Sequence, residues 1–334
     1  MSFMEEEQMT NEILEYFRKA NGEYVSGQQI SDALKVSRTA IWKHIKVLKD
    51  RGYIFESSTK KGYRLIYAPD LLTPLEVSNE LKTDILGKRI VYMEITKSSN
   101  NEAKMIAAQG AENGTLVIAE EQTGGRGRLT RNFYSPFAKG IWMSLILRPK
   151  FLPMEASKCT LMAAVAVCKA VRQFGLTEAG IKWPNDVLYK GKKLVGILTE
   201  MSSSMEKIDY IVVGIGINTG IKENEFPEEV RGRATSFLNE GIEISRKELL
   251  AAVLFELEKN YIEVEKYGFA NILEEWRKLT VTLGKNVQII SYGETYTGKA
   301  QDIDQDGCLL VKTDKGIKRV IVGDVSIRPA GNLK

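Results

Sequence analysis

The chain has 334 residues, which is too long for one ordinary hydrophobic core and predicts two or three domains. Hydrophobic residues make up 43% and charged residues 27%, the balance of a globular protein, and no apolar run approaches the roughly 20 residues that a membrane helix needs. The polar N-terminus and the three cysteines without metal-ligand spacing indicate neither a secretory signal nor a disulfide framework, so we expect a cytoplasmic protein without membrane association.

Residues 9–66 have the pattern of three helices followed by a hairpin. Apolar residues recur at helical spacing, and Ser26 and Ser37 can cap the second and third helices. The third helix, Arg38–Asp50, has an apolar face and an opposite basic face. Two strand-like runs joined by a polar turn come next. Residues 1–66 are therefore expected to form a winged helix-turn-helix domain.

Positive charge is concentrated in this same segment. Between Lys35 and Arg64, nine basic residues stand against two acidic ones, a charge of +7, so the rest of the chain sums to about −3. A basic helix is often merely solvated, but here helix, turn and basic hairpin coincide, which favours contact with the phosphate backbone of DNA. The expected DNA-binding residues are Arg38, Thr39, Lys43, Lys46, Lys60 and Lys61.

A central domain is expected over residues 80–275, after a linker at 67–79. Its strand-like and helical runs are mixed but do not alternate strictly, which predicts a mixed sheet of the α+β kind rather than a doubly wound one. The strand-like runs are 89–95, 116–120, 140–147, 194–200 and 210–217, and the helical runs are 101–109, 156–174 and 246–266.

The last domain, residues 276–334, has strand-like runs separated by short turns that contain glycine. We expect a small SH3-like β-barrel here, which makes the whole chain an α+β multidomain protein. The expected strands include 286–291, 308–313 and 318–322, and the expected turns are 292–293, 306–307 and 315–316.

Three motifs in the central domain carry chemistry. Glycines in Gly124–Arg128 allow close backbone approach, and its arginines bind carboxylates and phosphates through a planar fork. Lys182–Asp186 and Lys193–Glu200 add ammonium groups and a carboxylate beside sharp turns. Each motif alone also fits a plain interpretation: a surface loop, a structural turn and a charged hairpin. Together they describe a site for a carboxylic acid and a nucleotide phosphate.

Two other kinds of site are excluded. Gly214 and Gly216 give the first half of a dinucleotide-binding pattern, but the third glycine is Gly220, one residue too late, and no capped helix follows. Glycines inside a strand more often mark the close approach of a ligand or of another backbone. His44 is the only histidine, which excludes a histidine-rich metal centre and argues against a Ser-His-Asp triad.

The order and spacing of these motifs, together with the N-terminal pattern, resemble the biotin protein ligases that also act as biotin operon repressors. The resemblance extends over nearly the whole chain and implies a class II synthetase-like central domain. It also implies an ATP-dependent ligase that uses Mg²⁺, forms biotinyl-5′-AMP and transfers biotin to a lysine of biotin carboxyl carrier protein. Biotinyl-5′-AMP would further serve as corepressor, promoting a homodimer that binds operator DNA.

The resemblance also implies roles for individual residues. Phe133 stands where many members of the family carry tryptophan, and the loop Arg231–Ser236 would lie near the ribose and phosphate. The catalytic residues would be Lys193, Arg126, Arg128 and Asp186, with Asp186 also a candidate Mg²⁺ ligand. The biotin-binding residues would be Ser98, Ser99, Asn100, Gln122, Gly125, Arg126, Lys193, Gly196 and Gly214. The ATP- and adenylate-binding residues would be Arg128, Arg131, Phe133, Lys182, Asn185 and Asn218.

Two alternatives stay open from the residues. A lipoate or octanoate protein ligase has a related fold, although this chain lacks the histidine expected in that family's glycine-rich motif. A ligand-sensing repressor without ligase activity would keep the helix-turn-helix but not the catalytic residues, and the presence of Arg126, Arg128, Asp186 and Lys193 argues against it.

Overall fold

The structure, a computed structural model, describes residues 3–128, 131–291, 294–321 and 323–328. The chain divides into two compact units, Met1–Asp70 and Leu71–Lys334. Within the described residues, none of the helices combines the length and the apolar composition that crossing a bilayer requires.

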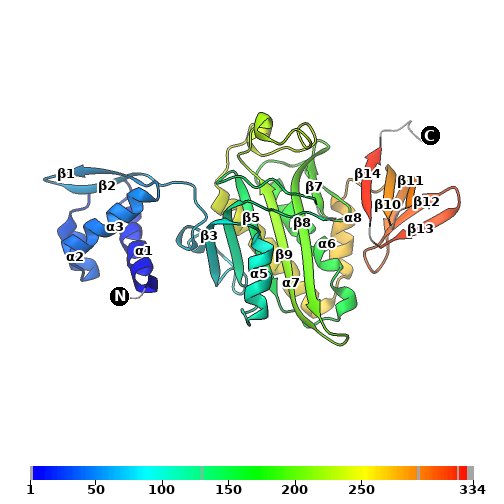
Figure 1. The fold of residues 1–334 in the computed structure, drawn as a ribbon, viewed down its shortest axis with the longest axis horizontal. Coiled ribbons are helices and arrows are strands. Elements are labelled where there is room, and N and C mark those ends of the chain that lie inside the picture. Colours follow the sequence, from blue (N-terminus) through cyan, green and yellow to red (C-terminus); the bar gives the residue numbers. More distant parts are fainter. Residues whose placement is uncertain (1–2, 129–130, 292–293, 322, 329–334) are drawn as a thin grey trace. The chain divides into compact units, whose positions relative to one another are not determined.

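The first unit is the expected winged helix-turn-helix (Figure 1). It contains α1 (Phe3–Lys19), α2 (Gly27–Leu34), α3 (Arg38–Asp50), β1 (Ile54–Ser58) and β2 (Gly62–Tyr67). Ser26 accepts a hydrogen bond from the backbone of Gln29, and Ser37 accepts one from Ala40, so both predicted helix caps are confirmed. The apolar faces of the helices form a small core that contains Ile13, Phe17, Ile30, Ile41, Ile45 and Leu48.

The second unit is built on a seven-stranded sheet in the order β3-β4-β5-β9-β8-β7-β6. Strands β3 and β4 run parallel, and the other neighbouring strands run antiparallel, which confirms the predicted mixed sheet. The strands are β3 (Ile90–Thr96), β4 (Leu116–Gln122), β5 (Gly140–Leu147), β6 (Gly180–Lys182), β7 (Asp186–Tyr189), β8 (Lys192–Ser203) and β9 (Ile208–Asn218).

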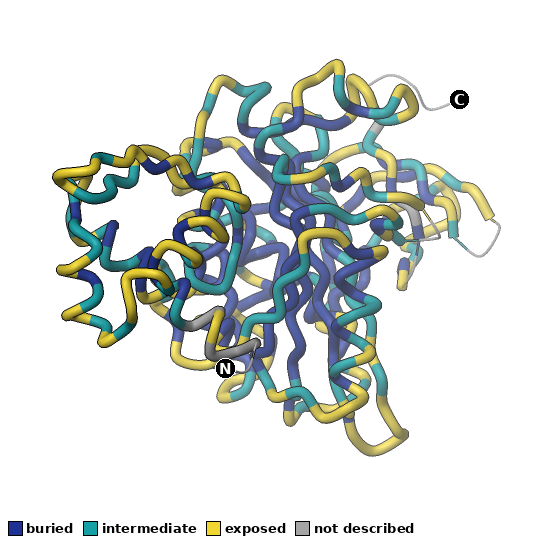
Figure 2. Tube along the Cα trace, turned by 60° about the vertical axis from the view of Figure 1, so that its left-hand side comes forward, coloured by how far each residue is buried: buried dark blue, intermediate teal, exposed yellow. Residues whose placement is uncertain are grey.

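Helices cover both faces of this sheet. Helix α5 (Ser99–Ala108) packs on β4, β5 and β9, while α6 (Lys158–Gln173), α7 (Arg246–Tyr267) and α8 (Ala270–Leu279) lie on the opposite face (Figure 1). Small residues let α6 pack closely, and it is buried along most of its length. The middle strands are buried over most of their length as well (Figure 2). Three short 3-10 turns occur at Pro153–Glu155, Glu223–Glu225 and Leu238–Glu240.

Five antiparallel strands complete the second unit in the order β13-β12-β11-β10-β14. The last strand lies beside the first, which is the strand order of the expected SH3-like domain. The predicted turns at 306–307 and 315–316 are present, and the one at 292–293 lies outside the described residues. The strands are β10 (Asn286–Ser291), β11 (Glu294–Ile303), β12 (Leu309–Thr313), β13 (Gly316–Val320) and β14 (Asp324–Arg328).

The segments between the expected domains differ from a simple linker. Residues 67–79 contain the helix α4 (Pro74–Ser78), which Thr73 caps, and Leu72 and Val77 are fully buried in the core of the second unit. Helix α8 continues across the expected boundary at residue 275 and donates hydrogen bonds from Arg277 to Asp302 and Ile303. Burial of apolar side chains therefore makes α4 part of the second unit and joins its central and C-terminal parts through α8.

A fully buried ion pair holds the start of the second unit to its sheet. Arg246 Nη1 at the start of α7 lies 2.8 Å from Glu120 Oε2 on β4, with side chains 2% and 0% exposed. The other oxygen of Glu120 accepts a 2.6 Å hydrogen bond from the backbone of Leu72, and Arg246 also donates to the carbonyl of Gly140. Each charge thus has its polar partners inside the protein, as a buried charge requires.

Replacing Arg246 by methionine should leave the Glu120 carboxylate buried without its cation. We expect the free energy of unfolding, measured by urea titration, to fall by about 3–5 kcal/mol. The control is Lys318→Met, which breaks an exposed 3.4 Å ion pair with Glu294 and should cost less than about 1 kcal/mol. Equal losses in the two variants would contradict this account.

Candidate functional site

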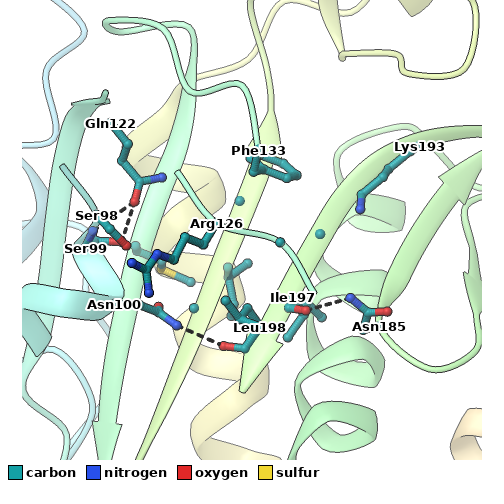
Figure 3. A pocket seen from close by; sticks show the side chains of 16 residues that line it. Ser98, Ser99, Asn100, Gln122, Arg126, Phe133, Asn185, Lys193, Ile197 and Leu198 are labelled. Atoms are coloured by element: carbon teal, nitrogen blue, oxygen red, sulfur yellow. Dashed lines mark hydrogen bonds between the residues drawn. The ribbon is translucent and has the colours of Figure 1, made fainter. Parts of the chain in front are cut away.

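An open pocket lies on the central sheet, lined by apolar side chains and a few polar groups. Its walls come from the start of α5, the end of β4, the loop after β4, and the strands β8 and β9. Figure 3 shows Asn100 and Arg126 on one side of the pocket and Lys193 on the opposite side. Residues that are far apart in the sequence therefore meet at one place.

Ten of the sequence-predicted site residues line this pocket, and six lie behind or beside it. The ten are Ser98, Ser99, Asn100, Gln122, Arg126, Phe133, Asn185, Lys193, Gly196 and Gly214. The six are Gly125, Arg128, Arg131, Lys182, Asp186 and Asn218. The lining also includes residues that were not predicted as site residues: Gly127, Met143, Ile197, Leu198, Ile215 and Gly216.

One end of the pocket is a hydrogen-bonded cluster of small polar side chains. Gln122 Oε1 accepts bonds from the backbone N and from Oγ of Ser99, at 2.9 and 3.1 Å. Gln122 Nε2 donates to Ser135 Oγ at 3.0 Å, which uses one of its two hydrogens. Ser98, 2% exposed, and Asn100, 4% exposed, complete this end. These side chains are held in fixed orientations before any ligand arrives.

The floor of the pocket consists of glycines on β8 and β9. Gly196 and Gly216 are cross-strand partners, and a Cβ atom on either would come within 2.7 Å of the Phe133 ring. A Cβ on Gly214 would lie 2.1 Å from Asn100 Oδ1. The side chains above this floor can approach the backbone only because these three residues lack a Cβ.

Phe133 forms an aromatic wall over the glycine floor. Its ring meets the Trp142 ring edge-on, with centroids 5.8 Å apart, and Lys193 Nζ lies 5.5 Å from its centroid. An aromatic ring between a cation and a flat floor gives the pocket one face suited to a planar ligand group.

A carboxylate faces two lysines at the edge of the pocket. Asp186 Oδ1 lies 2.7 Å from Lys193 Nζ, an ion pair without the alignment of a hydrogen bond, and Oδ2 lies 3.9 Å from Lys182 Nζ. Asp186 also opposes Gly196 in the sheet, so the turn at 182–186 is fixed beside the pocket floor. Lys193 is thus paired with Asp186 in this structure.

The loop after β4 is a small hairpin. Gly127 N bonds to Arg131 O at 2.7 Å, and Phe133 N bonds to Gly125 O at 2.9 Å; residues 129–130 lie outside the described chain. Gly125 itself is pressed against this hairpin, since a Cβ there would lie 2.4 Å from Phe133 O. Arg126 is exposed and lines the pocket, while Arg131 is exposed at the turn of the hairpin.

Arg128 links the hairpin to two other parts of the unit. It donates to Asn185 Oδ1 at 3.2 Å and to the carbonyl of Gly323 at 3.3 Å. Asn185 in turn donates to the carbonyl of Ile197 at 2.8 Å (Figure 3). The arginine loop, the 182–186 turn, β8 and the C-terminal domain are therefore joined by one chain of hydrogen bonds.

A second arginine loop, Arg231–Ser236, braces the pocket from outside. Lys193 N bonds to Arg233 O at 2.8 Å, and Thr235 N bonds to Lys193 O at 2.9 Å. The side chain of Arg231 donates to the backbone carbonyls of Asn224 and Phe226, which precede this loop. Asn218, 3% exposed, donates to Thr235 O, and its Oδ1 has no hydrogen-bond partner among the described residues. This loop fixes the Lys193 backbone.

The donor set for a metal is small. Among the described residues, no group of three or more histidine, cysteine, aspartate or glutamate side chains converges. Asp186 is a single carboxylate beside the pocket, and Mg²⁺ commonly takes one or two carboxylates together with substrate phosphates and water. The residues therefore fit an ion brought by a nucleotide rather than a complete protein cage.

The first unit presents its six expected DNA-binding residues to solvent. Four lie on α3 and two at the turn between β1 and β2, and all six are exposed. Lys46 Nζ lies 5.9 Å from the ring centroid of Trp42, which is 53% exposed on the same helix. Lys61 Nζ lies 5.5 Å from the ring centroid of Tyr24. The basic face is thus supported by aromatic side chains.

Three models of known families match along the chain. The biotin/lipoate A/B protein ligase family matches residues 92–218, a helix-turn-helix domain matches 10–64, and the biotin protein ligase C-terminal domain matches 282–328. The pocket therefore lies in the part that resembles the ligases, and the basic face in the part that resembles the helix-turn-helix domains.

Similar proteins match this chain over most of its length. The bifunctional ligase/repressor BirA of Bacillus subtilis is 40% identical over 96% of this chain and 98% of its own length, and that of Escherichia coli is 32% identical over 93% and 95%. The structure of a biotin protein ligase from Aquifex aeolicus in complex with biotin and ATP is 30% identical, covers 72% of this chain and 99% of its own, and has a TM-score of 0.62. The chain belongs to the biotin protein ligase family, and within it to the bifunctional ligase/repressors.

Proposed function

We propose that the second unit joins biotin to ATP and transfers biotin to a lysine of biotin carboxyl carrier protein, and that the first unit binds operator DNA. The observation that carries the choice of acid is the polar end of the pocket. A cyclic urea has two N–H donors and one carbonyl acceptor. Gln122 Nε2 keeps one hydrogen for that carbonyl, while Asn100 Oδ1 and the serine hydroxyls offer acceptors for the N–H groups.

This polar end also argues against lipoate and octanoate. Neither acid carries hydrogen-bonding groups at the end remote from its carboxylate, so either would leave the second Nε2 hydrogen of Gln122 and the second Oδ1 lone pair of Asn100 without a ligand partner. A site built to hydrogen-bond its substrate rejects analogues that lack the partner groups by large factors. The apolar lining, which includes Met143 and Ile215, would hold the ligand between its two polar ends.

The reaction would have two steps. The biotin carboxylate attacks the α-phosphorus of ATP, which forms biotinyl-5′-AMP and releases pyrophosphate. The lysine amine of the carrier protein then attacks the acyl carbon, an amide forms and AMP leaves. No enzyme nucleophile is needed, so catalysis would come from positioning and from cations directed at developing negative charge.

The positions of three cationic side chains support this proposal. Arg126 and Lys193 line opposite sides of the pocket, and Arg128 lies behind Asn185. Lys193 would exchange its contact with Asp186 for the reacting carboxylate and α-phosphate. Phe133 would pack against the adenine, and Arg131, Lys182 and Asn218 would complete the nucleotide contacts. Asp186, released from Lys193, would hold Mg²⁺, which shields the charge of the triphosphate.

Exchange of labelled pyrophosphate into ATP tests the first step. We expect exchange with biotin and little with lipoate or octanoate, because only biotin satisfies the polar end of the pocket. Exchange that prefers lipoate or octanoate would make the chain a ligase for those acids. No exchange with any acid would favour a repressor that only senses its ligand.

Lys193→Ala should slow adenylate formation about 100-fold or more, equivalent to a barrier higher by roughly 3 kcal/mol, because it removes a preorganised cation. Single-turnover formation of biotinyl-5′-AMP measures the rate. The matched control is Lys192→Ala: this neighbour pairs with Glu223 at 3.2 Å and does not line the pocket. An unchanged rate in Lys193→Ala would remove this lysine from the mechanism.

In the first unit, the double variant Lys43→Ala/Lys46→Ala should weaken binding to duplexes of any sequence. Each phosphate contact contributes about 0.9 to the slope of log K against log salt concentration, so the slope should decrease by about 2. Lys19→Ala, an exposed lysine on α1, is the control and should leave the slope unchanged. An unchanged slope in the double variant would exclude α3 from the phosphate contacts.

Regulation would follow from linkage between the two units. Biotinyl-5′-AMP would favour a two-fold dimer, with reading helices about 34 Å apart or a multiple of it, provided that it binds the dimer more tightly than the monomer. Sedimentation velocity should therefore show a shift from monomer to dimer when biotin and ATP are added together. No change in size would rule out ligand-promoted dimerisation.

A further inference from the structure

An ion pair lies directly behind the polar end of the pocket. Lys104 Nζ on α5 is 2.5 Å from Glu200 Oε1 on β8, with side chains 32% and 28% exposed. The other oxygen, Glu200 Oε2, accepts a 2.9 Å hydrogen bond from Asn100 Nδ2. Glu200 closes the third sequence motif but does not line the pocket. Its hydrogen bond to the polar end of the pocket runs through Asn100, and its charge also acts on Arg126 in the pocket lining.

The hydrogen bonds of Asn100 permit one orientation of its amide. Glu200 as a carboxylate and the carbonyl of Leu198 can only accept, so both must face the NH₂ group; the Leu198 bond, at 3.3 Å, is drawn in Figure 3. These two bonds use both hydrogens of Nδ2. The Ser144 hydroxyl, at 2.6 Å, then donates to Asn100 Oδ1. A second lone pair of Oδ1 is the only bonding capacity that this amide retains.

The orientation of Asn100 also limits the directions of the neighbouring hydrogen bonds. The Ser144 hydroxyl has one hydrogen and gives it to Asn100, so it cannot also donate to Ser99 Oγ, which lies 2.8 Å away. The single hydrogen of the Ser99 hydroxyl goes either to Ser144 or to Gln122 Oε1. Burial alone would raise the pKa of the Glu200 carboxyl, but hydrogen bonds from Lys104 and Asn100 outweigh burial and hold this pKa below its ordinary value. Glu200 is thus ionised at neutral pH and accepts only.

We propose that Glu200, held by Lys104, is a positioning residue for substrate selectivity: it fixes the Asn100 amide so that oxygen, not nitrogen, is offered to a urea N–H of biotin. This inference rests on the proposed function and adds a residue that does not touch the substrate. Without the carboxylate, only the 3.3 Å bond to the Leu198 carbonyl holds this orientation, so the amide turns more easily by 180° and presents a donor to a donor. The affinity for biotin should fall, while the nucleotide site should keep its geometry.

Calorimetric titration of the full chain with biotin alone measures this effect without requiring turnover. Glu200→Ala should raise the Kd for biotin about tenfold or more, since a buried hydrogen bond is lost and its partner is left unpaired. The KM for ATP should change little. In an Asn100→Ala background the same Glu200→Ala change should have a much smaller effect, because only the charge of Glu200 near Arg126 then remains to act on the site. Glu200→Gln, whose amide oxygen can still accept from Asn100, should restore part of the affinity.

Two further variants guard against a general loss of structure. Glu225→Ala breaks an ion pair of matched length and exposure, Lys139–Glu225 at 2.7 Å with side chains 36% and 34% exposed, away from the pocket lining, and should leave the Kd unchanged. Lys104→Met keeps the Glu200 carboxylate but removes its anchor. It should raise the Kd less than Glu200→Ala does, and again only when Asn100 is present. This variant supplies the test if Glu200→Ala does not fold.

These experiments distinguish a failure of the proposed function from a failure of the positioning role of Glu200. If the wild-type chain binds no biotin and shows no exchange with it, the proposed function fails. If the wild-type chain binds biotin and Glu200→Ala stays within twofold of its Kd, the positioning role is overturned. A loss of the same size in the Asn100→Ala background would also overturn it, because the carboxylate would then act by another route.

Discussion

A cavity in the middle of a packed sheet needs a place where side chains are absent. Gly196, Gly214 and Gly216 supply that place on two adjacent strands, and the Phe133 ring and the Asn100 amide lie directly on the exposed backbone. The close packing of protein interiors leaves no other route to such a space, since even one added methyl group would contact the atoms above it. The position of the pocket thus depends on three missing Cβ atoms as much as on the side chains around them.

Strand β8 connects the two ends of this pocket. Lys193 lies near the start of the strand and Glu200 seven residues further on, and between them Ile197 and Leu198 offer carbonyls to Asn185 and Asn100. One strand therefore carries the proposed catalytic lysine, the carboxylate behind the polar end and the backbone acceptors that orient two asparagines. Rigid elements hold functional groups in place more accurately than loops do.

The sequence predicted most of the fold and the core of the site, and the reasons for the rest are physical. Caps and periodicity located α3 and β5, because those signals are local. The segment Thr73–Glu76 carried a capping pattern with proline at the first helical position, which could have revealed α4. Met143 and Ile215 gave no signal, since a pocket-lining residue in a buried strand looks like any other core residue. Nor could spacing show that Asp186 pairs with Lys193, or that Glu200 lies behind Asn100, because both depend on strand register.

The buried bond between Leu72 and Glu120 has a practical consequence for dividing this chain. Glu120 lies two residues before Gln122 on β4, so the strand that ends at the pocket also anchors the first buried residue of the second unit. A shortened ligase that begins at residue 80, where the chemistry-bearing part begins in sequence, would lack the backbone donor of Leu72 and the apolar contacts of Val77. A cut at Asp70 instead follows the boundary of the compact unit and keeps both. To exchange DNA-binding domains, the chain should therefore be cut at Asp70, ten residues before residue 80, where the motifs place the start of the central domain.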